Sequence, residues 1–211
     1  MDKMLGWCLS THIPKSSRGL RPKKTLAGVL KVDVGAEGLI YMEQAGATFY
    51  EVVEADIVAP ILGIKSADFN STFKPQVVST GLKDLIVILN SEEVLNSLKP
   101  DFEAMLAFSK AHDITGMHVL CLLDSQPSLA AARNFAPLVG IDEESATGTS
   151  NGAFLCYLKK YGGLPAQNEY RIEQGKSMSQ TSYIYGKFEN ETVWIGGNAT
   201  IMKEMEVILS K

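Results

Sequence analysis

The segment from Ala131 to Gly163 most constrains the fold, because in it a polar loop leads directly into an apolar helix. A strand is expected over residues 131–136, a loop over 140–150 and a helix from Asn151 to Tyr161, ended by two glycines. Residues 153–158 are apolar in unbroken succession, Ala-Phe-Leu-Cys-Tyr-Leu. A helix without a polar side is typical of one buried on every face. We therefore expect the start of this helix to lie inside the protein.

A buried helix start has backbone N–H groups without intrahelical partners and the positive end of the helix dipole. Thr147, Gly148, Thr149 and Ser150 form the small, hydroxyl-rich string that enters this helix. These four residues are our candidate anion site. The simpler alternative is that Thr149 or Ser150 only caps the helix.

Two further stretches are candidates for the same site. Ser79-Thr80-Gly81 is a small polar turn at the end of an apolar strand. Ser79 and Gly81 are candidate ligand-binding residues there, with an ordinary hydrogen-bonded turn as the alternative. The carboxylate pair Glu143-Glu144 precedes the anion loop, and a carboxylate held beside a buried helix start can be tuned for proton transfer. Two surface acids are the alternative.

The histidines and cysteines indicate no metal site. His12, His112 and His118 are scattered and have no metal-ligand spacing to cysteines or paired carboxylates. We expect His118, within an apolar strand, to be a hydrogen-bonded core histidine. The three cysteines are an odd number, and we expect them to be reduced and structural.

Composition excludes two classes of partner. The 211 residues have a net charge of −4 and a pI near 5.5, which argues against nucleic-acid binding. No apolar run approaches the roughly 20 residues that span a membrane, and the first residues lack a signal-peptide core, so we expect a cytoplasmic protein. Residues 1–24 carry six basic side chains and one acid, Asp2, and are expected to be a flexible leader. The remaining pattern alternates hairpin-like strands with amphipathic helices, the last of them over residues 200–209, which favours an α+β fold with a mixed sheet.

Four ordered segments resemble the phenazine-biosynthesis (PhzF-like) isomerase family. They are VVSTGLKDLIV at residues 77–87, ARNFAPLVGIDEESATGTSNGAFLCYL at 132–158, EQGKSMSQTSYIYG at 173–186 and VWIGGNA at 193–199. Four segments in family order are more specific than any single short motif.

The resemblance implies the diaminopimelate epimerase-like fold, in which two pseudo-symmetric halves each wrap a curved mixed sheet around a central helix. The active site lies in the cleft between the halves. Residues 1–75 are then an incomplete N-terminal half, and residues 76–211 form the C-terminal half with its central helix at 150–161.

The resemblance also implies a reaction, the cofactor-free isomerisation of a small carboxylate metabolite by proton transfer. Glu144 occupies the position of the family's catalytic aspartate, and Thr149 that of its serine. Thr147, Gly148 and Ser150 belong to the same motif. No metal or cofactor is implied.

The first half departs from the family pattern, because the catalytic glutamate and the Gly-His-Ala segment have no counterpart before Thr25. The chain therefore resembles an N-terminally truncated member, which we expect to show no proton exchange at carbon if it works alone, and to form a homodimer through exposed apolar surface. The alternative is a non-catalytic remnant that binds a small anion or only oligomerises. A hydrolase using Thr149 or Ser150 lacks a paired base.

Overall fold

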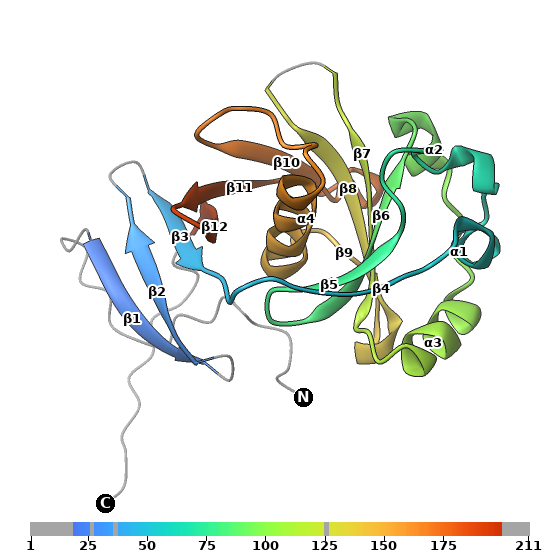
Figure 1. Ribbon diagram of the computed structural model, residues 1–211, viewed down its shortest axis with the longest axis horizontal. Helices are drawn as coiled ribbons and strands as arrows, with labels where there is room; N and C mark the ends of the chain where they lie inside the picture. Colours follow the sequence, from blue (N-terminus) through green and yellow to red (C-terminus); the bar gives the residue numbers. More distant parts are fainter. Residues whose placement is uncertain (1–18, 26–27, 36–37, 125–126, 200–211) are drawn as a thin grey trace, which may run out of the picture.

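A computed structural model describes residues 19–25, 28–35, 38–124 and 127–199. The described strands are β1 (Gly19–Thr25), β2 (Gly28–Val34), β3 (Leu39–Glu43), β4 (Thr48–Val52), β5 (Gln76–Ser79), β6 (Lys83–Leu89), β7 (Gly116–Leu122), β8 (Ala130–Ala136), β9 (Ile141–Glu144), β10 (Tyr170–Gln174), β11 (Ser182–Glu189) and β12 (Thr192–Asn198). The α-helices are α1 (Ala55–Leu62), α2 (Glu92–Ser97), α3 (Phe102–Ala111) and α4 (Gly148–Lys160). Figure 1 shows α4 enclosed by the sheet and α1 to α3 gathered on its outer side.

The strands form one mixed sheet in the order β1-β2-β3-β12-β11-β10-β8-β7-β6-β5-β4, with β9 paired to β8. The pairs β6–β7 and β8–β10 are parallel, and the other pairs are antiparallel. Helix α4 contacts β5 and β6 and also β11 and β12, which lie far apart in this order. The sheet must therefore curl around α4, which confirms the expected curved mixed sheet around a buried central helix.

The alternation along β6 divides the core into two parts. Leu85, Val87 and Leu89 face α1, α2 and α3, whereas Ile86 and Ile88 face α4. All five side chains are at most 1% exposed. A parallel strand covered on both faces needs such a continuous apolar run.

Helix α4 is buried as its sequence predicts. Eight of its residues from Ser150 onward are buried, among them Phe154, Leu155 and Leu158, each 0% exposed. Gly152 permits its close approach to the sheet, because a Cβ there would lie 3.2 Å from Gln44 Cγ and 3.2 Å from Thr80 Oγ1.

The N-terminal region differs in part from expectation. Residues 19–25 form β1, which pairs with β2 along its whole length, so the expected flexible leader is wrong for residues 19–24. The long-range pairing with β2 decides this structure, and local composition does not reveal it. Residues 1–18, and a helix expected over 200–209, lie outside the described residues. Strand β3 pairs with β12, and β4 pairs with β5, so strands from both sides of residue 75 belong to one sheet. The domain boundary expected at residues 75–76 stays a prediction.

Candidate active site at the start of helix α4

The first turn of α4 lacks a side-chain cap. Thr147 is the N-cap residue, and its side chain accepts no capping hydrogen bond. Thr149 and Ser150 lie inside the helix, so the alternative in which they cap it is wrong. Thr147, Gly148 and Thr149 are half-buried, whereas Ser150 is buried. The start of α4 thus combines a buried interior side with a partly open side where backbone N–H groups can meet an anion.

The β5–β6 turn, which follows Ser79 and contains Gly81, lies against the first turn of α4. The two candidate stretches are therefore neighbours. Thr80 Oγ1 donates a hydrogen bond of 3.0 Å to the Thr149 carbonyl, and a Cβ on Gly81 would lie 3.4 Å from Thr149 Cγ2. The Gly81 N–H donates internally to Ser79 Oγ at 3.1 Å. Ser79 and Gly81 are therefore placed beside the anion loop, but this particular N–H already has a partner.

The neighbouring acids Glu143 and Glu144 point in different directions because they alternate along β9. Glu143 forms a two-pronged ion pair with Arg133, at 2.9 Å from Nε and 2.7 Å from Nη2. Although burial alone raises the pKa of Glu143, the hydrogen bonds from Arg133 and Ser177 hold it below its usual value. Glu143 is thus a structural anion.

Glu144 faces the start of α4. Its Oε2 accepts a hydrogen bond of 3.1 Å from Thr147 Oγ1. Burial raises the pKa of the Glu144 carboxyl, and the hydrogen bond from Thr147 partly opposes this rise. A half-buried carboxyl group with a raised pKa is a candidate for acid–base chemistry.

A second carboxylate, Asp84, lies beneath the first turn and was missed by sequence reasoning. It is 3% exposed, and its Oδ2 accepts a hydrogen bond of 2.6 Å from Ser150 Oγ. Burial raises the pKa of Asp84 to about 6, opposed by hydrogen bonds from Ser150 and the Gly116 backbone, and the negative charge of Glu144 raises it further. Because the Ser150 hydroxyl is engaged inside the protein, only its backbone remains for a ligand. The sequence signal that could have identified Asp84 is an acidic residue at the start of an otherwise apolar strand.

A buried polar chain continues from α4 to the middle of the sheet. Asn151 Nδ2 donates to the Thr147 carbonyl at 2.7 Å and to Gln174 Oε1 at 3.0 Å. His118 Nε2 lies 3.1 Å from Asn151 Oδ1, and its Nδ1 lies 3.0 Å from the Asn134 side-chain amide. Burial lowers the pKa of His118 to about 4, against the effect of both hydrogen bonds. His118 is thus the hydrogen-bonded core histidine that was predicted, whereas the roles of Asn151 and Gln174 were not foreseen.

The described residues contain no cluster of His, Cys, Asp and Glu side chains that could hold a metal ion. Within the same ranges, no helix is long and apolar enough to cross a membrane. Of the cysteines, Cys121 and Cys156 are free thiols, and Cys8 lies outside the described residues.

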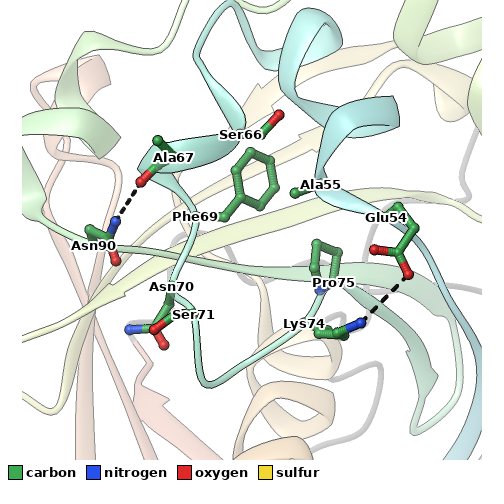
Figure 2. Close-up of a pocket in the computed structure, with 10 residues that line it drawn as sticks. All are labelled: Glu54, Ala55, Ser66, Ala67, Phe69, Asn70, Ser71, Lys74, Pro75 and Asn90. Carbon is green, nitrogen blue, oxygen red and sulfur yellow. Dashed lines mark hydrogen bonds and ion pairs between the residues drawn. The ribbon is translucent and has the colours of Figure 1, made fainter.

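A pocket of about 350 Å³ lies apart from the start of α4, between α1 and the segment that precedes β5 (Figure 2). Phe69 and Pro75 line it, together with the exposed ion pair of Lys74 and Glu54. None of the candidate site residues lines it.

A comparison with models of protein families shows the family to which the chain belongs. The family model described as "Phenazine biosynthesis-like protein" matches residues 18–205. The chain belongs to this PhzC-PhzF family. The match confirms the resemblance seen in the four sequence segments.

Several curated relatives of the chain are named as isomerases. An uncharacterized isomerase of Clostridium acetobutylicum is 29% identical over 89% of this chain and 67% of its own length. The trans-2,3-dihydro-3-hydroxyanthranilate isomerase of Pseudomonas aeruginosa is 27% identical over 68% of this chain and 49% of its own length. The chain thus spans from about half to two thirds of the length of these two relatives.

A crystal structure of a PhzF-family protein from Bacillus anthracis shares the fold. Its TM-score is 0.75 at 23% identity, over 92% of this chain and 70% of that chain. The similarity confirms the expected epimerase-like fold class of the PhzC-PhzF family.

Proposed function

We propose that the start of α4 binds the carboxylate of a small metabolite. Glu144 then exchanges a proton with a carbon atom of the same metabolite, in a cofactor-free isomerase or epimerase reaction. One observation carries the proposal: the uncapped N-terminus of a buried helix and a carboxyl group with a raised pKa meet at Thr147. The helix end favours an anion, and the carboxyl group supplies acid–base chemistry.

Each candidate residue has a role in this proposal. The N–H groups of Gly148, Thr149 and Ser150 receive the ligand carboxylate. The Thr149 hydroxyl, half-buried at the same turn, donates a hydrogen bond to the ligand. Thr147 holds Glu144 in place, while Ser79 and Gly81 form the adjacent wall and shape the entrance.

The names of the relatives support the same reaction class. The Pseudomonas aeruginosa relative is named as an isomerase of trans-2,3-dihydro-3-hydroxyanthranilate, a small molecule with a carboxylate. We propose a substrate of this chemical class for the present chain.

A second candidate is a small-anion-binding protein without turnover. It is favoured by the burial of Asp84 beneath Ser150, which leaves Glu144 as the half-buried carboxylate at the first turn. A proton shift between two carbons needs groups placed over both of them. A single half-buried carboxylate at this turn fits binding better than turnover.

Solvent deuterium incorporation and calorimetry separate the two candidates. We expect trans-2,3-dihydro-3-hydroxyanthranilate to bind the purified 211-residue protein, and Gly148→Val to weaken binding by about tenfold or more by obstructing the backbone. Deuterium incorporation that disappears in Glu144→Gln supports the isomerase-type site. Binding without incorporation supports the anion-binding candidate, and absence of binding contradicts both.

We also propose that the protein is a homodimer. The edge strand β4 exposes Tyr50 and Val52, which are 38% and 46% exposed, and the opposite edge strand β1 exposes Leu20, which is 58% exposed. Exposed apolar side chains on open sheet edges favour association. Light scattering that reports a monomer at all concentrations would contradict this assembly.

A further inference from the structure

The side-chain amide of Gln174 is a fully buried junction between β10 and the start of α4. It is 0% exposed and makes four hydrogen bonds. Its Nε2 donates to the Glu144 carbonyl at 2.8 Å and to Thr147 Oγ1 at 3.0 Å. Its Oε1 accepts from Thr147 N at 3.3 Å and from Asn151 Nδ2 at 3.0 Å. One amide thus contacts the strand that carries Glu144 and Thr147, which occupies the N-cap position of α4.

The surrounding donors and acceptors determine the orientation of this amide. The Thr147 carbonyl only accepts, so the Asn151 amide must direct Nδ2 toward it. The same Nδ2 then faces Gln174 Oε1. A reversed Gln174 amide would place its NH2 group against two donors and its oxygen against the Glu144 carbonyl. The arrangement therefore has a single consistent direction.

This direction fixes where the Thr147 hydroxyl hydrogen points. A hydroxyl group has one hydrogen to donate. Because Thr147 Oγ1 accepts from Gln174 Nε2, its own hydrogen remains for Glu144 Oε2, 3.1 Å away. The three groups form a directed chain, from the Gln174 amide through the Thr147 hydroxyl to the Glu144 carboxylate.

We propose that Gln174 is a positioning residue that directs the Thr147 hydroxyl onto Glu144 and fixes the carboxylate at the start of α4. This role rests on the proposed function of Glu144. Gln174 itself does not touch the ligand. It acts through Thr147, by orienting a donor that stabilises the ionised form of Glu144.

Among the described residues, the hydrogen bond from Thr147 is the contact that stabilises the ionised form of Glu144. The neighbouring charged groups do not replace it. On β6, the buried carboxyl group of Asp84 interacts unfavourably with the negative charge of Glu144. On β7, burial keeps His118 neutral by lowering its pKa to about 4. On β8, Arg133 is bound to Glu143. After β10, Lys176 pairs with Glu92.

The test measures the pKa of Glu144 by carbon NMR of its carboxyl group in the folded protein without ligand. Gln174→Met removes the amide, so we expect the Glu144 acid dissociation constant to fall by about tenfold, the size of one charged hydrogen bond. Thr147→Val has the same effect, whereas Thr147→Ser retains the wild-type value. Because the groups act in series, adding Gln174→Met to Thr147→Val causes no further change.

Gln76→Met is the matched control. Gln76 is also a buried strand glutamine, 5% exposed, and its Nε2 donates to the Tyr50 carbonyl at 2.8 Å, away from Glu144. We expect it to lower stability without changing the pKa of Glu144. If Gln174→Met does not fold, Gln174→Asn, which retains an amide but cannot reach Thr147, is expected to give the same change.

An unchanged Glu144 pKa in the folded Gln174 variant, or additive changes in the double variant, would overturn the positioning role. This readout needs no turnover, so it separates failure of the positioning role from failure of the proposed function. If the protein shows deuterium exchange, Gln174→Met is also expected to move the acidic limb of its pH profile to higher pH.

Discussion

Ser150 Oγ donates a hydrogen bond of 2.6 Å to Asp84 Oδ2, which joins the first turn of α4 to the start of β6. The two side chains are 2% and 3% exposed. A carboxylate in such surroundings is costly to ionise, even with a hydroxyl donor beside it. The contact therefore links the geometry of the candidate site to the pH dependence of folding.

The first prediction concerns Asp84. Its pKa of about 6 in the folded protein lies above the 3.8 of an unperturbed aspartate, so the folded state binds the proton more tightly. The free energy of unfolding therefore loses a contribution of about 3 kcal/mol as pH rises from about 4 through 6. Asp84→Asn is expected to remove this loss, measured by urea unfolding at about pH 4 and about pH 7. A difference between variant and wild type that is the same at both pH values would contradict the prediction.

His118 is expected to act in the opposite direction. Its pKa of about 4 lies below the 6.5 of an unperturbed histidine, so the unfolded state binds the proton more tightly. The free energy of unfolding therefore falls by about 3 kcal/mol as pH decreases from about 6.5 to 4. In the same urea experiment, His118→Gln should lose stability relative to wild type at about pH 7 and recover part of it at about pH 4. If the difference in unfolding free energy between His118→Gln and wild type changes from about pH 7 to about pH 4 in the same direction as it does for Asp84→Asn, the prediction is wrong.

Gly116→Ala is expected to destabilise the fold by more than about 3 kcal/mol. A Cβ at Gly116 would lie 1.8 Å from the Phe135 carbonyl oxygen, so the paired strands β7 and β8 must separate. Gly46→Ala is the control, because a Cβ there meets no atom within 4 Å. Its urea midpoint should match the wild type, and equal midpoints for both variants would show that the strands adapt freely.

Arg133→Met should cost about 3 to 5 kcal/mol, because it leaves the Glu143 carboxylate buried without its partner. The Arg133 side chain is 11% exposed and that of Glu143 is 14% exposed. Lys159→Met removes an exposed pair with Glu191, 91% exposed, and should cost at most about 1 kcal/mol. Adding Glu143→Gln to Arg133→Met is expected to restore part of the lost stability. Equal losses for the Arg133 and Lys159 variants would mean that burial does not govern the pair.

The parts of the site that were predicted from sequence are those with strong local patterns. The unbroken apolar run within α4 predicts its burial, and the apolar strand around His118 predicts a histidine whose hydrogen bonds are satisfied within the core. Glu144 was expected in a loop but lies in β9, since the polar residues of this strand show no alternation and its structure comes from pairing with β8.

Long-range contacts explain what sequence reasoning missed. Asp84 directly follows a turn-like stretch, and its hydrogen-bond partner Ser150 lies 66 positions later. Gln174 is separated by 27 positions from Thr147, and nothing local marks its amide as a junction. Residues 19–25 are basic and polar, and only the pairing with β2 makes them a strand.

The central claim is that the start of α4 binds a small carboxylate through its backbone. The most direct measurement follows the nitrogen-15 amide signals of Gly148, Thr149 and Ser150 during titration with anthranilate, at constant ionic strength maintained with sodium chloride. We predict saturable shifts of these three amides in the wild type and their loss in Gly148→Val, while signals from β1 to β3 stay unchanged. Amides at the start of α4 that do not respond, in a protein whose spectrum shows it to be folded, would contradict the claim.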